Sequence, residues 1–508
     1  MFGASSSMAA AAAGTPGGGG GLHHDHDHGM SPPPLPAVRV RRWGDTFYLE
    51  GARSSPPATT RPRGRSGCVW SDAGEIGSGT RPVLQPVSGS DARGGDHGHR
   101  PVPRAVPRMR DPPAWRTVDH QGSVVDELRL GVIAHTAKEN ERRLPIHPRH
   151  IERIDADLRA RIVLEEGYGA NFGVPDRELA DLVSGLRPRS QLIATSDVVL
   201  LPKPLAPDLK ELRAGQVLWG WPHCVQDREL TQVAVDRRLT LIAWEAMNHW
   251  HRDGSYNLHV FHQNNELAGY CSVLHAMQLI GSTGHYGRRP LKAAVIGFGA
   301  TARGAIGALN GLGIHDIDVL TTRDVHAVAD PIHFVRILHH EHPADEPHGS
   351  IVTLEDGETV PFAAFLAEHD IVVNCVLQDP NNPSMFLVDD DLPAFQRGSL
   401  IVDVSCDEGM GFSWARPTSF EDPMFTVGDG VHYYAVDHSP SYLFDAATWE
   451  ISEALLPHLR TVLDGSTAWD GDETIRRAIE IRDGVILNAD IIAFQQRHEE
   501  YPHPHAHG

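Results

Sequence analysis

Residues 292–324 contain the pattern that most limits how this chain can fold. The apolar stretch KAAVI leads into Gly297-Phe298-Gly299, a helix-like stretch follows, and a second apolar run ends at Thr321. A strand that turns on glycines into a helix and is followed by a second strand is typical of a βαβ unit. The sequence therefore predicts an α/β protein built on parallel sheets.

The glycine turn is also typical of a site that binds a dinucleotide. Gly297 can make the tight turn, and Gly299 allows the backbone to approach a pyrophosphate at the positive end of the following helix. Ala302 stands at the position of the third glycine, where helix–strand packing tolerates the replacement. The alternative is a structural turn that holds no nucleotide. The strand, turn and helix together favour a Rossmann-type cofactor site.

The end of the second strand bears on which dinucleotide we expect. A carboxylate there would hydrogen-bond the 2′-hydroxyl of the NAD ribose and repel a 2′-phosphate. This chain instead has Thr321, Thr322 and Arg323, which are two neutral hydroxyls and a permanent cation suited to phosphate. The pattern favours NADP(H). NAD(H) stays possible, because Asp324 follows directly and Arg323 could be a solvated loop charge.

The N-terminal quarter differs from the rest of the chain in composition. Residues 1–125 alternate glycine runs, proline clusters and Arg-Pro pairs, which predicts a disordered extension with brief order near residues 38–50. The formal charge of this segment is +4, so the remaining residues carry −25 of the total of −21. An acidic body repels phosphate backbones, and we therefore expect no nucleic-acid partner.

Cysteine use and hydropathy favour a cytoplasmic protein. The five cysteines lie without paired spacing, which is typical of a reduced chain. No apolar run approaches the roughly 20 residues that span a bilayer, so no membrane partner is expected. The N-terminus lacks the basic start and apolar segment of a secretion signal. Histidine tracts at 23–28 and 503–507 are more often incidental than ligands, so we predict no metal.

Short apolar runs and helix-like segments alternate from residue 126 onward, and this alternation predicts two Rossmann-like domains. The substrate domain is expected over 126–264 and is completed by 441–508, whose pattern predicts amphipathic helices. The dinucleotide-binding domain is expected over 265–440. It begins with a long connecting helix over 266–281.

Polar side chains follow several of the predicted strands. Lys203, one of only four lysines, follows VVLLP, and His223 follows VLWGWP. Arg142 and Arg143 come after the first strand, and Asp407 ends LIVDVSCD. Ligands of open α/β sheets bind beyond the carboxyl ends of the strands, where an ammonium can polarise a carbonyl and a guanidinium can clamp a carboxylate. A surface lysine and an inert histidine are the alternatives, and spacing alone indicates only a nucleotide-dependent enzyme.

Nine short motifs resemble, in the same order, those of one superfamily of amino-acid oxidoreductases. This superfamily contains alanine dehydrogenase, transhydrogenase-related proteins, carboxyethyl-ornithine synthase and the lysine-forming saccharopine dehydrogenases. The resemblance covers about residues 128–495, and its motifs are ENERRLPIHP, VLEEGYG, VVLLPKP, GQVLWGWPH, ELAGY, GFGATARGA, GSLIVDVSCDEG, ARPTSFEDPMF and DHSPS. GFGATARGA and the non-acidic strand end most resemble carboxyethyl-ornithine synthase, a family that uses NADPH.

The resemblance implies roles for four residues. Arg143 resembles the arginine that binds the substrate carboxylate, and Lys203 resembles the lysine that contacts the oxo acid and polarises its carbonyl. His223 resembles the general acid/base, and Asp407 resembles the aspartate beside the nicotinamide. The resemblance also implies a cleft between the two domains and usually a homo-oligomer.

The expected function is a reductive condensation of a 2-oxo acid, most simply pyruvate, with the amine of an amino acid such as ornithine or lysine. The alternatives are an alanine dehydrogenase that uses ammonia and a saccharopine dehydrogenase-like enzyme. A third alternative, from another class, is a non-catalytic nucleotide or amino-acid sensor. The four site residues do not separate the enzymes, because each reaction needs all of them.

Overall fold

The structure is a computed structural model. It describes residues 127–287, 289–323, 332, 335–342 and 349–506, with the backbone of four short strands, β1 (Arg39–Trp43), β2 (Thr46–Glu50), β3 (Thr117–Val118) and β4 (Val124–Val125). Apart from these strands, the predicted disordered extension lies outside the described residues, as do the histidine tract at 23–28 and Asp324. β1 and β2 pair antiparallel where the sequence predicts brief order. Residues 107–508 form one compact unit, and the rest of the description concerns that unit.

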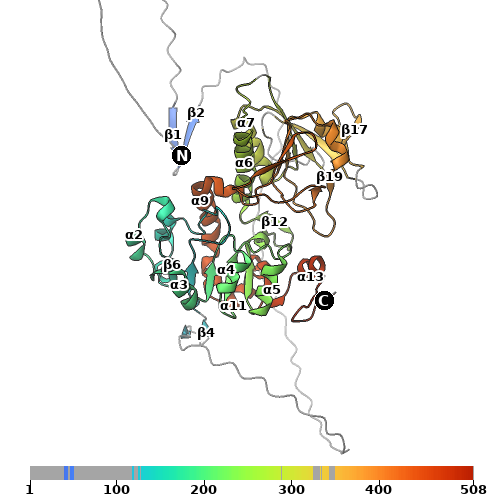
Figure 1. Ribbon diagram of the computed structural model, residues 1–508. Coiled ribbons are helices and arrows are strands. Elements are labelled where there is room, and N and C mark those ends of the chain that lie inside the picture. Colours follow the sequence, from blue (N-terminus) through green and yellow to red (C-terminus); the bar gives the residue numbers. More distant parts are fainter. Residues whose placement is uncertain are drawn as a thin grey trace, which may run out of the picture. The chain divides into compact units, whose positions relative to one another are not determined.

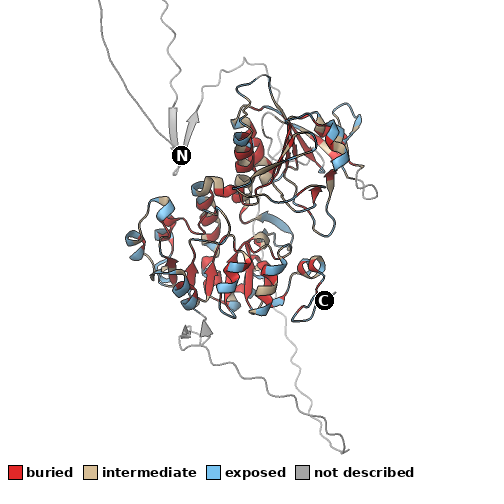
Figure 2. Ribbon diagram, in the orientation of Figure 1, coloured by how far each residue is buried: buried red, intermediate tan, exposed pale blue. Residues whose placement is uncertain are grey.

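The first sheet has eight strands in the order β25-β24-β10-β9-β8-β5-β6-β7. The six strands from β5 to β10 are parallel, and their order is the 3-2-1-4-5-6 order of a doubly wound Rossmann fold. Their bounds are β5 (Leu130–Val132), β6 (Ile162–Glu165), β7 (Gly185–Arg187), β8 (Val198–Leu200), β9 (Val217–Gly220) and β10 (Thr240–Ala243). These strands are mostly apolar because both faces of the sheet are covered. Figure 2 shows most of them as buried, whereas the edge strand β7 is intermediate to exposed.

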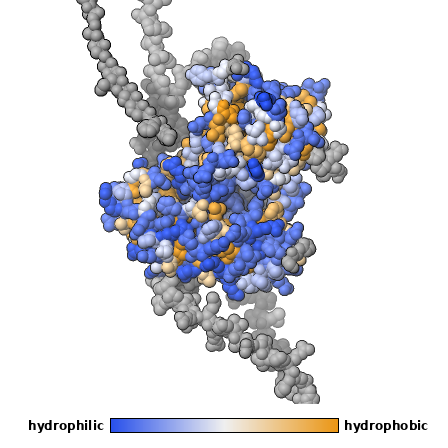
Figure 3. Space-filling model, in the orientation of Figure 1, coloured by the Kyte–Doolittle hydropathy of each residue, from blue (hydrophilic) through white to orange (hydrophobic). Residues whose placement is uncertain are grey.

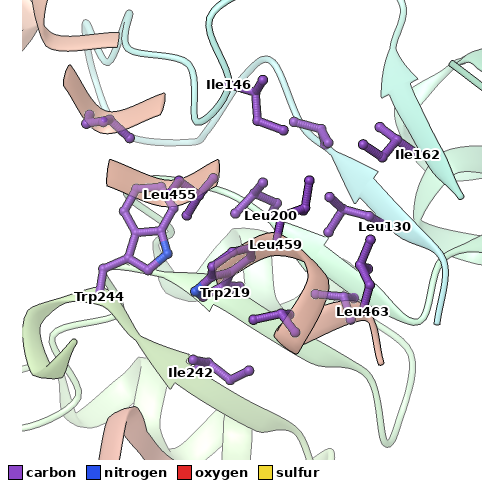
Figure 4. Close-up of a cluster of buried hydrophobic side chains, with 14 of the residues drawn as sticks. Leu130, Ile146, Ile162, Leu200, Trp219, Ile242, Trp244, Leu455, Leu459 and Leu463 are labelled. Carbon is purple, nitrogen blue, oxygen red and sulfur yellow. The ribbon is translucent and has the colours of Figure 1, made fainter. Parts of the chain in front are cut away.

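Helices from both ends of the described sequence cover this sheet. The first group is α1 (Ala156–Arg159), α2 (Asp176–Ala180), α3 (Arg189–Thr195), α4 (Ala206–Glu211) and α5 (Arg228–Asp236). The second is α9 (Phe444–Leu455), α10 (Leu459–Leu463), α11 (Ser466–Gly471), α12 (Glu473–Ala478) and α13 (Ala489–Gln495). Figure 4 shows Leu455, Leu459 and Leu463 of the second group in one apolar cluster with Leu130 and Trp219 of the sheet. The C-terminal helices therefore complete the core of the first sheet.

The sequence prediction of helices throughout the tail is wrong for residues 479–486. This stretch forms the hairpin of β24 (Ile479–Arg482) and β25 (Val485–Ile486), and β24 extends the sheet antiparallel to β10. The two residues between the strands, Asp483 and Gly484, have φ angles of 52° and 83°. An Asp-Gly pair between alternating apolar residues is a strong hairpin signal, because both positions favour positive φ. The helical periodicity of the flanking residues masks this hairpin signal in the sequence.

The second sheet has nine strands in the order β17-β16-β15-β14-β13-β18-β20-β23-β22. Its parallel part again has the 3-2-1-4-5-6 order, which confirms the prediction of two Rossmann-like folds. The parallel strands are β13 (Lys292–Ile296), β14 (Asp316–Thr321), β15 (Arg336–Glu341), β18 (Ile371–Asn374), β20 (Leu400–Asp403) and β23 (Val431–Tyr434). Antiparallel edges are added by β16 (Ile351–Thr353), β17 (Thr359–Pro361) and β22 (Met424–Val427). The domain boundaries drawn from the sequence stay predictions.

Two helices next to the glycine turn lie unusually close together. α6 (His262–Leu279) is the predicted connecting helix and begins four residues earlier than expected; α7 (Ala300–Gly311) runs beside it (Figure 1). A Cβ atom added to Gly269 would lie 1.9 Å from the carbonyl oxygen of Thr301, and one added to Gly304 would lie 1.7 Å from that of Glu266. Only glycine permits backbones to approach this closely. The contact fixes the helix that follows the glycine turn.

The described surface is mainly polar. The face drawn in Figure 3 is mostly hydrophilic, with apolar residues in smaller patches. Among the described residues, no helix has both the length and the apolar character that crossing a membrane would require.

Candidate active site

One cleft of about 990 Å³ brings together the four polar residues that the sequence singles out, Arg143, Lys203, His223 and Asp407. Thr301 of α7 also lines this cleft, so it adjoins the helix that follows the glycine turn. Residues far apart in sequence therefore meet beyond the carboxyl ends of parallel strands, which is where ligands of open α/β sheets bind.

Lys203 and His223 form the centre of the cleft. Each lies three residues after the end of a neighbouring parallel strand, Lys203 after β8 and His223 after β9. The Nζ atom of Lys203 is 3.2 Å from Nε2 of His223. Because an ammonium group can only donate, Nε2 is the acceptor and the ring proton belongs on Nδ1. Two adjacent loops thus place an ammonium and an imidazole in direct contact.

His223 is held in an uncommon backbone conformation. Its φ angle is +49°, in the left-handed region that a non-glycine residue rarely adopts. Its backbone N–H donates to Oε1 of Glu245 at 2.6 Å, and its carbonyl accepts from the N–H groups of Gln226 and Asp227. Strained residues of this kind persist where surrounding contacts determine the conformation, often at functional sites.

The charge state of His223 differs from that of a free imidazole, whose pKa is about 6.5. The ring is 43% exposed to the cleft, yet desolvation and then the Lys203 charge lower its pKa below the ordinary 6.5. Burial, and then the charge of Glu480, raise the pKa of Glu245, whose Oε1 lies 4.0 Å from His223 Nδ1. His223 is therefore neutral at neutral pH, and the lowered pKa makes it a weaker proton acceptor than a free imidazole.

An acidic residue from the second half of the chain anchors the lysine. Asp437 Oδ2 is 3.7 Å from Lys203 Nζ and 2.8 Å from Lys138 Nζ, and Oδ1 is 2.8 Å from Nδ1 of His438. Burial would raise the pKa of Asp437, but the Lys203 charge, the His438 hydrogen bond and the Lys138 charge together hold it well below its usual value. The carboxylate therefore stays ionised and keeps the Lys203 ammonium, whose side chain is 12% exposed, directed into the cleft.

Arg143 is buried beside the same centre. Its Nε donates to Oε1 of Glu141 at 2.8 Å, and its Nη2 donates to Oε2, so one edge of the guanidinium is already paired. Burial would raise the pKa of Glu141, but the charge and hydrogen bonds of Arg143 outweigh it and lower the pKa. Nη1 donates a hydrogen bond to the side-chain oxygen of Asn264 at 3.3 Å and, among the described residues, pairs with no carboxylate. The Nη1–Nη2 edge is therefore the one that can take a substrate carboxylate. Arg142 instead stacks on the ring of Phe444.

The sequence predicts that Asp407 lies at the end of a strand, but the structure places it beyond the strand end. β20 ends at Asp403, which is buried and paired with Asn374 and Tyr433. Asp407 lies in the turn that follows, where burial raises its pKa to about 6 although the Lys203 charge opposes the shift. A carboxyl group with this pKa can change protonation state near neutral pH.

The glycine turn fits a dinucleotide. Gly297 has a φ angle of +98°, and a Cβ atom there would lie 3.2 Å from the carbonyl oxygen of Cys375. A Cβ atom on Gly299 would meet nothing within 4 Å, so this face of the turn is open. Gly299 provides no side-chain cap for α7 and the first turn has no acidic residue, which leaves the positive helix end available to a pyrophosphate. Ala302 is fully buried and packs the helix against the sheet.

The three residues at the end of β14 separate into two kinds. Thr321 is buried, and its hydroxyl accepts a hydrogen bond from the backbone N–H of Arg323, so it stabilises the turn. Thr322 and Arg323 are exposed. The Arg323 guanidinium donates to the carbonyl oxygen of Phe298 at 2.8 Å, which places it over the glycine turn. Thr322 and Arg323 are thus the candidates for contact with a ribose or its phosphate.

Sequence analysis missed three acidic residues that organise the site, Glu141, Glu245 and Asp437. Glu141 and Asp437 stand inside motifs that were identified, ENERRLPIHP and DHSPS, but an acid within a motif does not reveal which base it will meet. Glu245 follows β10, next to the strand that carries His223, so strand adjacency was the available signal. In the described part of the chain, no group of three His, Cys, Asp or Glu side chains is placed to hold a metal ion.

Two family models match the chain. "Alanine dehydrogenase/PNT, N-terminal domain" matches residues 131–268, and "Alanine dehydrogenase/PNT, C-terminal domain" matches residues 265–489. Together the matches contain both sheets and all four predicted site residues.

Individual relatives are similar at low identity. An N(5)-(carboxyethyl)ornithine synthase of Clostridium botulinum is 24% identical over 336 residues, covering 63% of this chain and 90% of that protein. An alanine dehydrogenase of Mycobacterium tuberculosis is 26% identical over 383 residues, covering 71% of this chain and 95% of that protein. A solved structure of an L-alanine dehydrogenase has a TM-score of 0.57 at 19% identity, covering 72% of this chain and 99% of that one. The structural likeness shows a shared fold.

Proposed function

Because the chain belongs to the alanine dehydrogenase/PNT family of oxidoreductases, which act with a nicotinamide cofactor, we propose a particular reaction within that family. The reaction is the NADPH-dependent condensation of a 2-oxo acid, most simply pyruvate, with the amine of an amino acid such as ornithine or lysine. The observation that carries the proposal is the extent of the cleft. It continues beyond the Lys203–His223 pair to Gln226, Asp227 and Arg228, which gives room for a second substrate.

Binding of the oxo acid uses the two cationic side chains. The free edge of the Arg143 guanidinium holds its carboxylate, while Glu141 keeps the other edge fixed. The Lys203 ammonium donates a hydrogen bond to the carbonyl oxygen and makes the carbonyl carbon more electrophilic. Asp437 holds this ammonium in position. Fixing the carbonyl carbon in this way lowers the entropic cost of attack by the amine.

Proton transfer uses His223. The incoming amine arrives protonated, and neutral His223 removes one proton, so that the nitrogen lone pair can attack the carbonyl carbon. After attack, a second proton moves from the nitrogen to the alkoxide oxygen and gives the carbinolamine. The proton held by His223 then converts the carbinolamine hydroxyl to water, which leaves as the C=N bond forms. When bound, the reduced nicotinamide supplies the hydride that reduces the imine carbon. We assign to Asp407 the orientation of the reacting nitrogen.

The proposed function is tested by an amine-dependence assay. NADPH oxidation is followed with pyruvate and, in turn, ammonium, ornithine and lysine, and the product mass is determined. We expect turnover with ornithine or lysine and a product in which pyruvate is joined to the amino acid. Turnover with ammonium alone, giving alanine, would instead identify an alanine dehydrogenase. Tight NADPH binding without turnover on any amine would indicate a sensor.

We further propose that Arg323, with Thr322, contacts the 2′-phosphate of NADPH. Support comes from the position of its guanidinium over the glycine turn and from the lack of a carboxylate at the end of β14. We expect Arg323→Glu to raise the KM for NADPH by about 100-fold, because a charge-assisted contact is lost and a repulsive one is added. The KM for NADH should change less than about threefold, because NADH has no 2′-phosphate.

Steady-state kinetics with both cofactors checks this prediction. Arg397→Glu is the matched control, because Arg397 is a surface arginine that is 78% exposed and paired with Asp429. An equal rise in KM for NADPH and NADH would show that Arg323 does not recognise the 2′-phosphate. The homo-oligomer also stays a prediction, which sedimentation would test.

A further inference from the structure

The part of the cleft beyond His223 contains a cationic side chain, Arg228, to which the proposed mechanism gives no role. Arg228 is the first residue of α5 and lines the cleft. The loop from His223 to Arg228 is short and closed, since the N–H groups of Gln226 and Asp227 donate to the His223 carbonyl at 3.2 and 3.0 Å. The backbone of Arg228 is therefore held close to that of the proposed proton acceptor, His223.

The neighbours of Arg228 do not neutralise it. Asp227 caps α5 by accepting from the N–H of Leu230 at 2.9 Å, and Glu229 pairs with Lys210 at 2.6 Å. The exposed Arg228 guanidinium makes a long 3.4 Å contact with the carbonyl oxygen of Phe494. Among the residues that the structure describes, no carboxylate lies within ion-pair distance of it. Arg143, by contrast, is fully paired along one edge by Glu141.

The cleft also offers negative charge for an ammonium group. The exposed Glu408 lines it from the turn after β20. A guanidinium and a carboxylate on different loops of one cleft are suited to the two charges of an amino-acid head group. A terminal amine on the same molecule would then extend toward Lys203 and His223.

We infer that Arg228 binds the α-carboxylate of the amino acid that donates the amine. The donor is thus a diamino acid, whose head group lies at Arg228 and whose side-chain amine reacts at the Lys203–His223 pair. This inference rests on the proposed function. It assigns the two substrate carboxylates to different arginines, the oxo acid to Arg143 and the donor to Arg228.

The test compares ornithine with 1,4-diaminobutane, which has the same terminal amine but no carboxylate. In Arg228→Met, we expect the KM for ornithine to rise about 10- to 100-fold, the effect of losing a charge-assisted hydrogen bond. The kcat/KM for 1,4-diaminobutane and the KM for pyruvate should stay within twofold of wild type. Arg177→Met is the matched control, because Arg177 is exposed on α2 and does not line the cleft.

Each other outcome counts against the inference in a recognisable way. An unchanged KM for ornithine in Arg228→Met, with amine-dependent turnover intact, would overturn the role of Arg228 and leave the proposed function standing. Equal kcat/KM values for ornithine and 1,4-diaminobutane in the wild type would show that no donor carboxylate is recognised. Turnover of the wild type with ammonium alone would overturn the proposed function itself, and the inference with it.

Discussion

Replacement of Lys203 by alanine is expected to lower kcat for the proposed reaction by about 10³-fold, within the range of a positioned acid–base group. The ammonium lies 3.2 Å from His223 and is directed into the cleft by Asp437, so its loss removes the donor to the substrate carbonyl. The Kd of NADPH should stay within twofold, because Lys203 contacts His223 and Asp437 and not the residues of the glycine turn. Stopped-flow measurement of NADPH oxidation and titration of NADPH fluorescence separate the two effects.

A second readout distinguishes a direct role for Lys203 from a structural one. Because the Lys203 charge helps to lower the pKa of His223, the Lys203→Ala variant should show a higher pKa for that imidazole by NMR titration. Lys210→Ala is the control, since Lys210 pairs with Glu229 on the surface. Unchanged turnover in Lys203→Ala would exclude the lysine from the mechanism.

The substitution Asp318→Asn is expected to lower the free energy of unfolding more than the other substitutions considered above. Its side chain is 1% exposed within β14, and its two oxygens accept from Arg336 at 2.7 Å each. His369 Nε2 is 3.0 Å away and Lys292 Nζ is 3.4 Å away. Asp318→Asn leaves Arg336 and Lys292 without this counter-charge. We expect it to lower the free energy of unfolding by about 3 kcal/mol, the lower end of the cost of removing one partner of a buried ion pair, because the Arg336 side chain is 41% exposed.

The same network predicts a dependence of stability on acid pH. Burial would raise the pKa of Asp318, but the hydrogen bonds from His369 and Arg336 outweigh it and lower the pKa below 3.8. Because the folded pKa is lower than the unfolded pKa, the carboxylate contributes stability above about pH 4, which is lost as the pH falls toward the folded value. Urea denaturation across this range measures the effect. Asp318→Asn should lose less stability below pH 4 than the wild type does.

Asp429→Asn is the matched control for Asp318→Asn, because Asp429 is 90% exposed in its pair with Arg397. The change in its free energy of unfolding should be below about 1 kcal/mol, as for other exposed ion pairs. Equal midpoints for the wild type and Asp318→Asn would show that the surrounding cations do not depend on this carboxylate.

The features that sequence predicts well are those that depend on local geometry. The Gly297 turn needs a positive φ angle and the Gly299 position needs open space, so the amino-acid sequence alone identifies the strand–turn–helix unit. The alternation of apolar runs and helical segments indicates both doubly wound sheets. Lys203 and His223 were found for the same reason, because each follows a buried strand.

The features that sequence misses depend on contacts between distant segments. Asp437 is far from Lys203 in the chain, and the pairing of Glu141 with Arg143 becomes visible only when both are buried in the same wall. The burial of Thr321 likewise depends on where the strand ends. Periodicity cannot reveal which side chain a loop will present to another loop.

The C-terminal helix has a practical consequence for work on this protein. Gln495 in α13 is fully buried, and its amide donates to the carbonyl oxygens of Cys224 and Val225 at 2.6 and 3.2 Å, directly beside His223. A purification tag fused after residue 508 would therefore be attached close to a segment that contacts the backbone next to His223. Recombinant protein is better tagged at the N-terminus. A loss of turnover in C-terminally tagged protein should not be taken as evidence against the proposed reaction.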